Sequence, residues 1–171
     1  SSIKLEDIKG KKVLITCDQG LGDTILFSRF IKLLLDIKTD VTLVVMAAMV
    51  DLMKCIDSRI KIISATDNVM KYDYNISLGD LIHIFKLQET KIPKYKNYIN
   101  INKKYIDKWS RKIDKNKFNI GVIWQGRKNT IIDEGRSIEL KYFKNISKIH
   151  NVQLISLQKN EGIEQISDFQ K

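Results

Sequence analysis

Two short segments of the chain combine residue types that could carry chemistry. The first is Asp18-Gln19-Gly20-Leu21-Gly22-Asp23-Thr24, which places two glycines and a carboxylate directly after an apolar run. Gly20 and Gly22 would allow tight backbone geometry and close approach of a ligand, and the Asp23 carboxylate could take a proton from a hydroxyl group within hydrogen-bond reach. Asp is also a preferred N-cap, and Asp23 stands where a helix is expected to begin. Residue type alone therefore favours a capping role for Asp23 over a catalytic one.

The second segment is Trp124-Gln125-Gly126-Arg127-Lys128-Asn129, which continues to Asp133-Glu134-Gly135-Arg136-Ser137. The cations Arg127, Lys128 and Arg136, with backbone amides freed by Gly126 and Gly135, are suited to a diphosphate. The same residues are equally compatible with a surface loop that carries scattered charge. Ser137 precedes an apolar helical stripe that starts at Leu140, so it is also a candidate helix cap.

Both segments follow apolar runs that are typical of buried strands. The sequence predicts strands over residues 12–17, 41–46, 60–63, 72–76, 118–124 and 152–157, and helices over 23–37, 48–56, 104–113, 139–150 and from 161 onward. Strands that are nearly all apolar and alternate with helices indicate a parallel sheet covered on both faces. In an open parallel sheet, ligands bind beyond the carboxyl ends of the strands, where both segments lie. The expected fold class is therefore α/β.

The order of these elements predicts two units joined by a connector. Residues 1–90 form the first α/β unit, and residues 91–117 form a connector and helix that hold the only proline, Pro93. Residues 118–171 then open a second α/β unit with two strands and one helix. Because so few elements cannot bury a full core, this second unit is expected to be incomplete.

Positive charge is concentrated in the connector. The chain of 171 residues has 30 Lys+Arg and 20 Asp+Glu, and residues 91–117 alone hold ten basic and two acidic residues, a net charge of +8. Lysine supplies 25 of the 30 cations, beside 28 Ile and 11 Asn, a profile typical of AT-rich coding sequence and therefore poor evidence for nucleic-acid binding. The connector is either a solvated surface or a patch for an anionic partner such as phosphate, a lipid headgroup or nucleic acid.

Several classes of protein are excluded by what the sequence lacks. No run of about 18 apolar residues exists, so the sequence predicts no membrane-spanning helix. The sequence has no Walker loop for nucleotide phosphates, no pair of histidines spaced to bind a metal, and no Ser, His and Asp in the order of a catalytic triad. A dinucleotide-binding fingerprint would need a glycine in place of Ile25. Cys17 and Cys55 alone can form neither a disulfide framework nor a metal site, which suits a reducing cytoplasm. His83 lies in an apolar stretch and is predicted to be a partly buried packing residue.

Together, the two segments resemble the motifs of family 9 glycosyltransferases, the relatives of the ADP-heptose:lipopolysaccharide heptosyltransferases. The N-terminal motif is Gly10-Lys11-Lys12-Val13-Leu14-Ile15 followed by Asp18-Gln19-Gly20-Leu21-Gly22-Asp23-Thr24-Ile25-Leu26-Phe27-Ser28-Arg29-Phe30. Three further motifs follow in the family's order: Gly121-Val122-Ile123-Trp124-Gln125-Gly126, Arg136-Ser137-Ile138 and Ser156-Leu157-Gln158. The likeness covers about residues 10 to 160 and is strongest to the branch that is associated with tetratricopeptide repeats and is similar to O-GlcNAc transferases.

The resemblance implies a GT-B architecture, in which two Rossmann-like domains face each other across a cleft. The first domain would bind the acceptor and the second the nucleotide-sugar donor. It implies inverting sugar transfer without a metal or other cofactor, with Asp23 as the general base. The residues implied to contact substrate or donor are Gly20, Gly22, Thr24, Gln125, Gly126, Arg127, Lys128, Arg136, Ser137 and Gln158. Lys128, Arg127 and Arg136 would stabilise the charge that develops on the leaving diphosphate.

The resemblance also bears on partners and location. It implies a nucleotide sugar and a glycan, lipid-linked glycan or protein acceptor, no nucleic acid, and a cytoplasmic location that extends to the inner face of the membrane. Family members continue for about another hundred residues, with a glycine-rich donor motif that this sequence lacks. We therefore expect weak donor binding and little transfer by this chain alone. The competing hypothesis is a non-catalytic module that uses residues 91–117 to hold an anionic polymer or a membrane surface.

Overall fold

The computed structural model describes residues 3–68, 71–126 and 135–169. The chain divides into two compact units, residues 1–102 (unit 1) and residues 103–171 (unit 2), which are treated separately below. The connector predicted over residues 91–117 is thus shared between the two units.

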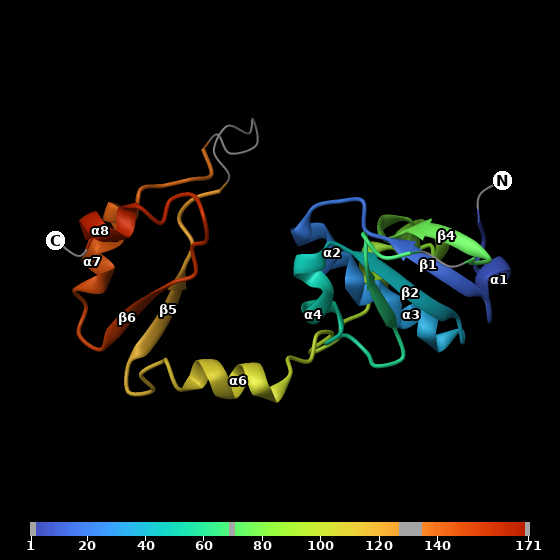
Figure 1. The fold of residues 1–171 in the computed structure, drawn as a ribbon, viewed down its shortest axis with the longest axis horizontal. Helices are drawn as coiled ribbons and strands as arrows, with labels where there is room; N and C mark the ends of the chain where they lie inside the picture. The colour runs from blue at the N-terminus through green and yellow to red at the C-terminus, as the bar shows by residue number, and fades with distance from the viewer. Residues whose placement is uncertain (1–2, 69–70, 127–134, 170–171) are drawn as a thin grey trace. The chain divides into compact units, whose positions relative to one another are not determined.

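Unit 1 is built on a parallel sheet of four strands. These are β1 (Lys12–Thr16), β2 (Asp40–Val45), β3 (Lys61–Ser64) and β4 (Tyr74–Ser77), in the order β3-β2-β1-β4 (Figure 1). The two central strands, β1 and β2, are the most apolar, and Val13, Ile15, Val41 and Leu43 are fully buried in them. This pattern fits a sheet whose central strands are covered on both faces.

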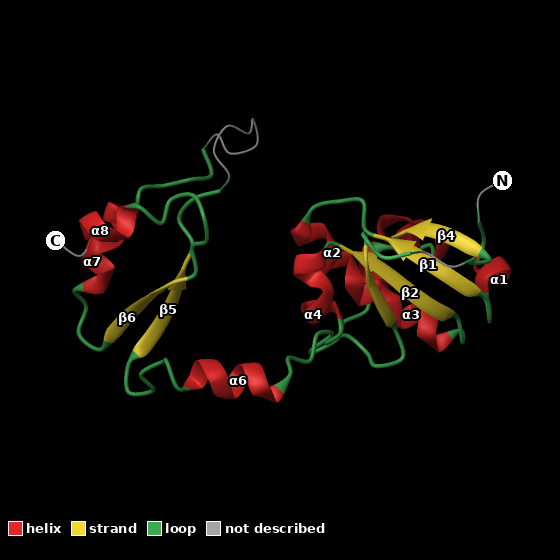
Figure 2. Cartoon of the chain, in the orientation of Figure 1, coloured by secondary structure: helices red, strands yellow, loops and turns green. Residues whose placement is uncertain are grey.

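Helices flank this sheet, as the secondary-structure colouring of Figure 2 shows. They are α1 (Leu5–Ile8), α2 (Leu21–Phe27), α3 (Ile31–Asp36), α4 (Val50–Met53) and α5 (Leu81–Ile84), with short 3₁₀ turns at η1 (Ser28–Phe30), η2 (Ala47–Met49), η3 (Leu78–Asp80) and η4 (Glu89–Lys91). The alternation of parallel strands and helices confirms the predicted α/β class, in a Rossmann-like form.

The long helix predicted over residues 23–37 is three pieces instead, α2, η1 and α3. The hydroxyl of Ser28, which is fully buried, donates to the Ile25 carbonyl oxygen at 2.8 Å. Bonds of this kind compete with the helical backbone ladder and bend helices, which accounts for the break. Leu21 and Leu26 in α2 are also about half exposed, at 46% and 47%.

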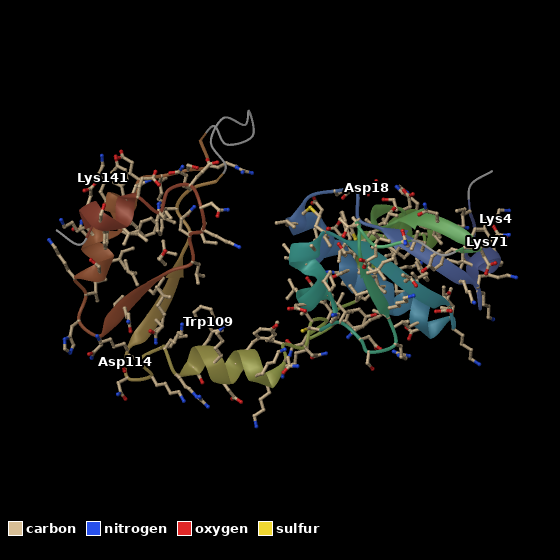
Figure 3. The ribbon with its side chains drawn as sticks, in the orientation of Figure 1. Lys4, Asp18, Lys71, Trp109, Asp114 and Lys141 are labelled. Atoms are coloured by element: carbon tan, nitrogen blue, oxygen red, sulfur yellow. The ribbon has the colours of Figure 1, made fainter. Side chains whose placement is uncertain are left out.

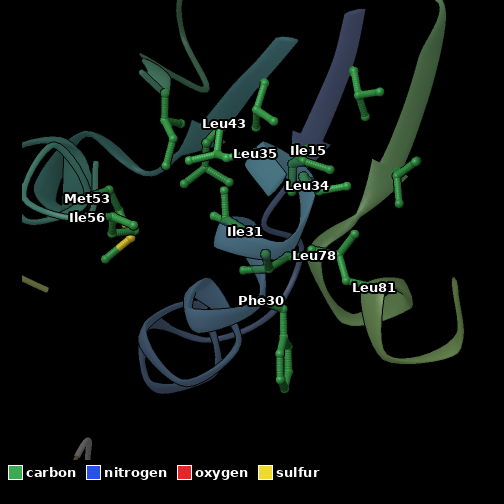
Figure 4. Packing of buried hydrophobic residues seen from close by; sticks show 14 of the residues in the cluster. Ile15, Phe30, Ile31, Leu34, Leu35, Leu43, Met53, Ile56, Leu78 and Leu81 are labelled. Carbon is green, nitrogen blue, oxygen red and sulfur yellow. The ribbon is translucent and has the colours of Figure 1, made fainter. Parts of the chain in front are cut away.

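The hydrophobic core of unit 1 lies between these helices and the sheet. Phe30, Ile31, Leu34 and Leu35 pack there with residues of the strands and with Met53, Ile56, Leu78 and Leu81 (Figure 4). Burial of so many large aliphatic side chains, each worth about 1.5–3 kcal/mol in transfer free energy, is the main source of stability in this unit.

The first part of the connector packs onto unit 1. Tyr95 lies under the Lys32 ammonium at 5.1 Å, and Tyr98 lies under the Arg29 guanidinium at 4.9 Å. The Asn100 amide donates to the Cys55 carbonyl oxygen at 2.7 Å. These aromatic side chains therefore serve packing and cation–π contacts.

Unit 2 contains α6 (Lys103–Ser110), β5 (Phe118–Val122), η6 (Leu140–Phe143), α7 (Lys144–Ser147), β6 (Val152–Ser156) and α8 (Gln165–Phe169). Strands β5 and β6 pair in parallel. Val122, Trp124 and Leu140 form its buried centre, against which Ile120, Phe143, Leu154, Ile166 and Phe169 pack. Ile123 and Leu157, which directly follow the two strands, are 65% and 58% exposed.

None of the helices in the described ranges is long and apolar enough to cross a bilayer.

Candidate functional site

The turn after β1 lies at the point where the strand order of the unit 1 sheet reverses. The chain runs from β1 to β2 and β3 on one side, then returns to place β4 on the other side of β1. In open parallel sheets, ligands bind outside the carboxyl ends of the strands at such a switch point. The turn over residues 17–20 and the η3 turn that follows β4 both lie there.

Contacts tie these two turns together. The Ser77 hydroxyl donates to Asp18 Oδ1 at 2.9 Å. A Cβ atom on Gly79 would lie 3.0 Å from Nε2 of Gln19, so the Gln19 side chain lies over this glycine. Figure 3 labels Asp18 at this edge of the sheet. Ser77 and Gly79 are therefore part of the candidate site, and the sequence analysis missed them. The available signal was a small polar residue and a glycine directly after a predicted strand.

Asp23 is not the cap of the helix that it enters. Helix α2 begins at Leu21, its N-cap is Gly20, and no side chain caps it. The predicted capping role of Asp23 is wrong because the helix starts two residues earlier than expected, with glycine as its cap. The Asp23 side chain is exposed in the first turn, where a carboxylate is favoured by the helix dipole. Its Oδ2 would lie 3.3 Å from a Cβ on Gly20, so the carboxylate folds back toward that residue.

The glycines of this turn provide space rather than unusual backbone geometry. Gly20 has an ordinary φ of −64°, and Gly22 lies within α2. The expectation of tight backbone geometry is therefore wrong for both residues. A side chain on Gly20 would crowd the Asp23 carboxylate, whereas a Cβ on Gly22 would meet no atom within 4 Å. The fold itself gives no reason for a glycine at position 22.

Thr24 and Cys17 lie on the inner side of the turn, toward the interior of unit 1. Thr24 is 4% exposed, and both its hydroxyl and its backbone amide donate to the Gly20 carbonyl oxygen, at 3.1 and 3.0 Å. These bonds leave Thr24 a positioning role. Burial raises the pKa of the Cys17 thiol to about 11, against the opposing effect of a hydrogen bond with Thr24. The raised pKa favours the protonated thiol, which is the less nucleophilic form.

The surface at this turn is only slightly concave. Cys17, Asp18, Gln19, Asp23, Thr24, Phe27 and Leu78 line a depression too small to enclose a water molecule. A larger groove of about 950 Å³ lies elsewhere in unit 1, lined by residues 3–6, by residues 75–76 of β4 and by residues 80 and 83–86 around α5. His83 faces that groove and is exposed, so its predicted packing role is wrong.

In unit 2, Gln158 holds the ends of both strands. Its Oε1 accepts from the backbone amides of Trp124 and Gln125, both at 3.1 Å. Its Nε2 donates to the carbonyl oxygens of Gln125 and Glu161 at 2.8 and 2.7 Å. With four hydrogen bonds made inside the protein, this side chain positions the loop and has little capacity left to bind a nucleotide directly.

The loop that follows β5 is closed at its base by two hydrogen bonds. The Gly126 amide donates to Ser137 Oγ at 3.0 Å, and the Ile138 amide donates to the Trp124 carbonyl oxygen at 3.0 Å. The Gly126 amide is therefore engaged rather than free. Ser137 does not cap the next helix, because η6 has Glu139 at its N-cap and no side-chain cap bond.

Gln125 and Trp124 point into unit 2. Oε1 of Gln125 accepts from Nε2 of Gln165 at 3.0 Å, and the Trp124 indole donates to the Gly162 carbonyl oxygen at 3.0 Å. Trp124 is only 3% exposed. Nε2 of Gln125 is buried and finds no hydrogen-bond partner among the described residues. The amides of Gln125, Gln158 and Gln165 thus form the interior of this loop region.

The predicted cations divide between described and undescribed parts of the chain. Arg136 is exposed and follows Gly135, whose φ of +76° is a left-handed value. Arg127 and Lys128 lie outside the described residues. No group of three or more His, Cys, Asp or Glu residues that could hold a metal ion occurs in the described ranges.

The structure thus places an exposed carboxylate at the switch point of unit 1 and an exposed cation beside a hydrogen-bonded loop in unit 2. Comparison with known proteins does not assign these features to a family. No protein-family model, curated protein or solved structure gives a significant match to this chain.

Proposed function

We propose that this chain carries out, or contributes to, inverting sugar transfer from a nucleotide sugar to an acceptor hydroxyl, as a GT-B glycosyltransferase related to family 9. One observation carries the proposal: an exposed carboxylate, Asp23, lies beside a glycine at the switch point of a Rossmann-like sheet, and the fold does not use it as a cap. A carboxylate in that position is available to take a proton from a bound hydroxyl group.

The charges of the two loops support the assignment of the acceptor to the first loop and of the donor diphosphate to the second. Between Cys17 and Ser28 the sequence has Asp18 and Asp23 but no Lys or Arg. An acidic turn repels a diphosphate and suits a neutral, hydroxyl-bearing acceptor. The loop over residues 125–137 contains Arg127, Lys128 and Arg136, so we assign the nucleoside diphosphate to it.

In the proposed reaction, Asp23 accepts the proton of the acceptor hydroxyl as its oxygen attacks the anomeric carbon. The bond between that carbon and the diphosphate oxygen breaks, and the electron pair leaves with the nucleoside diphosphate. Arg136, with Arg127 and Lys128, stabilises the negative charge that develops there. Gln158, Ser137 and Thr24 position the loops without touching the reacting atoms.

The donor assignment is tested by titrating UDP, GDP and ADP into the labelled protein and following its backbone amide resonances by NMR. We expect weak binding, with a Kd of about 1 mM or higher. Shifts should concentrate at Gln125, Gly126, Arg136 and Ser137. An Arg136→Gln variant should weaken binding, whereas Lys148→Gln, which removes an exposed cation beyond α7, should not. Absence of shifts at this loop with all three nucleotides would contradict the assignment.

The catalytic assignment is tested by long incubations with a panel of nucleotide sugars and acceptors, with product detected by mass spectrometry. We expect slow transfer that falls by about 10²–10⁴-fold in Asp23→Asn, because a general base contributes about that much. Asp36→Asn is the matched control, since Asp36 is an exposed carboxylate at the end of α3. Equal rates for Asp23→Asn and the unmodified chain would rule out Asp23 as the base.

A further inference from the structure

Helix α6 carries a surface that sugar transfer does not explain. None of its eight side chains is buried, and Ile106 and Trp109 are 54% and 53% exposed. At 100° per residue these two side chains fall on one side of the helix together with Tyr105. Lys103, Lys104 and Lys108 fall on the other side. Helix α6 is therefore amphipathic, with an aromatic and aliphatic side and a basic side. The segment over residues 103–117, which continues from this helix with Arg111, Lys112, Lys115 and Lys117, is called here the α6 surface.

Ammonium groups border two aromatic rings of the α6 surface, the exposed ring of Trp109 and the partly buried ring of Tyr105. The Nζ atoms of Lys112 and Lys108 lie 5.1 and 6.0 Å from the centre of the Trp109 ring, and that of Lys104 lies 4.9 Å from the Tyr105 ring. Figure 3 labels Trp109 on this helix. An indole beside ammonium groups is suited to the boundary of a bilayer, where the ring lies at headgroup level and the cations meet lipid phosphates.

Charge complementarity identifies the partner as anionic. The α6 surface holds seven basic residues and two acidic ones, Asp107 and Asp114, a net charge of +5. An exposed isoleucine beside the tryptophan adds aliphatic surface, which hydrocarbon covers and nucleobases do not. Binding of single-stranded nucleic acid uses a series of aromatic platforms for successive bases, whereas this helix presents one half-exposed indole.

We propose that the α6 surface docks on an anionic phospholipid bilayer, with the helix axis in the plane of the interface. Ile106 and Trp109 enter the headgroup region, and Lys108 and Lys112, whose ammonium groups border the Trp109 ring, contact phosphate groups. The helix is short, so the binding is reversible and depends strongly on salt. This role is independent of sugar transfer, and neither proposal needs the other to be correct.

The experiment uses the full chain and vesicles of phosphatidylcholine with or without about 30% phosphatidylglycerol. The chain has two tryptophans, and because Trp124 is buried, a blue shift of the emission reports on Trp109. We expect a blue shift and co-sedimentation with the anionic vesicles only. Binding should fall by about tenfold or more when the salt is raised from about 0.05 to 0.3 M. Trp109→Phe should retain much of the co-sedimentation while losing the spectral shift.

Matched variants separate this role from general attraction of a basic protein. Ile106→Ala combined with Trp109→Ala, and separately Lys108→Gln combined with Lys112→Gln, should each weaken vesicle binding by about tenfold. Tyr142→Ala and Lys144→Gln combined with Lys148→Gln are the controls, because Tyr142 is another exposed ring beside a lysine. Equal loss in the controls would overturn the proposal. Tighter binding of a polyuridine RNA than of the vesicles, with the same response to the variants, would also overturn it and assign nucleic acid instead.

Discussion

In unit 1 the candidate turn is supported by the packing of apolar side chains. In unit 2 the candidate loop is supported by hydrogen bonds of side-chain amides. In unit 1 the turn rests on a mostly aliphatic core, whose buried residues come from α1, α3, α4 and α5, from β1, β2 and β4, and from the segments between them. Among the described residues of unit 2, Val122, Trp124 and Leu140 alone form the buried apolar centre, and Gln125, Gln158 and Gln165 make the contacts that shape the loop. Aliphatic packing tolerates small changes of geometry, but a buried amide that loses a partner carries the full desolvation cost. The two loops should therefore differ in how they respond to substitution.

The largest effect is expected from a cavity in the core of unit 1. Leu34 is fully buried, so Leu34→Ala should lower the free energy of unfolding by about 2–5 kcal/mol. Leu26→Ala, in the preceding helix α2, is the control, because Leu26 is 47% exposed, and this substitution should cost less than about 1 kcal/mol. Urea denaturation followed by circular dichroism measures both values. Similar losses for the two variants would contradict the assignment of the core.

The next effect tests the amide contacts of unit 2. Gln158→Met keeps the length of the side chain but removes four hydrogen bonds, and we expect a loss of about 1–3 kcal/mol. Gln153→Met is the control, because Oε1 of Gln153 is buried with no hydrogen-bond partner within the described part of the chain. That substitution should be neutral or slightly stabilising. Fluorescence of buried Trp124 during urea denaturation, in a Trp109→Phe background, reports on this unit.

Substitution of one glycine in each unit gives a further comparison of unit 1 with unit 2. Gly22 lies in α2 with open space around a would-be Cβ, so Gly22→Ala should stabilise unit 1 by about 0.5–1 kcal/mol. Gly162 has a φ of +89°, and a Cβ there would lie 3.0 Å from Oε1 of Gln125, so Gly162→Ala should destabilise unit 2 by about 1 kcal/mol or more. Thermal melts of the two variants should move in opposite directions. Loss of sugar transfer in a stabilised Gly22→Ala variant would indicate that a ligand approaches this position.

The smallest effect concerns ion pairs. Asp57–Arg59 in unit 1 and Glu139–Lys141 in unit 2 both have contacts of 2.7 Å between residues two apart in the sequence. The hydrogen bond from Arg59 lowers the pKa of Asp57 to about 2. Because the pKa is lowered on folding, the pair stabilises unit 1 above the unfolded value of about 3.9 and loses its effect as the pH falls toward about 2.

This pH dependence is measurable with one variant. Arg59→Gln should remove this contribution, so the difference in melting temperature between the variant and the unmodified chain should shrink on going from about pH 5 to about pH 2.5. The change should be no more than about 2 °C, because pairs at the surface contribute little. A difference that grows in acid would contradict the stated direction.

The strands could be predicted from the sequence because each is a short apolar run bounded by polar residues or glycine. All six lie within two residues of their expected positions. The helix boundaries were harder to predict than the strands, because each boundary depends on a few single hydrogen bonds. The break at Ser28 results from one side-chain bond to Ile25, and Ser is compatible with a continuous helix. The start of α2 was misplaced because glycine, a weaker signal than aspartate, is its cap.

The positions of the two segments after β1 and β5 could be predicted, but the contacts that their residues make could not. The carboxyl ends of β1 and β5 follow from the α/β pattern, so the two loops could be found. The roles of Gln158 and Gln125 could not, because an amide has no hydrophobic periodicity and its partners are more than 30 residues away in the sequence. Thr24 matches a motif residue, yet it is buried under the turn. A motif identifies which residues belong together without saying which of them a ligand can reach.

The closed base of the loop in unit 2 determines which part of the chain can change in length or sequence without disturbing the strands. Two hydrogen bonds join Trp124 and Gly126 to Ile138 and Ser137, and Gln158 fixes the same point from the neighbouring strand. The chain between these anchors can be lengthened, shortened or replaced at little entropic cost, since closure entropy changes only slowly with length. This stretch could therefore be replaced by grafting, with the supporting strands left intact.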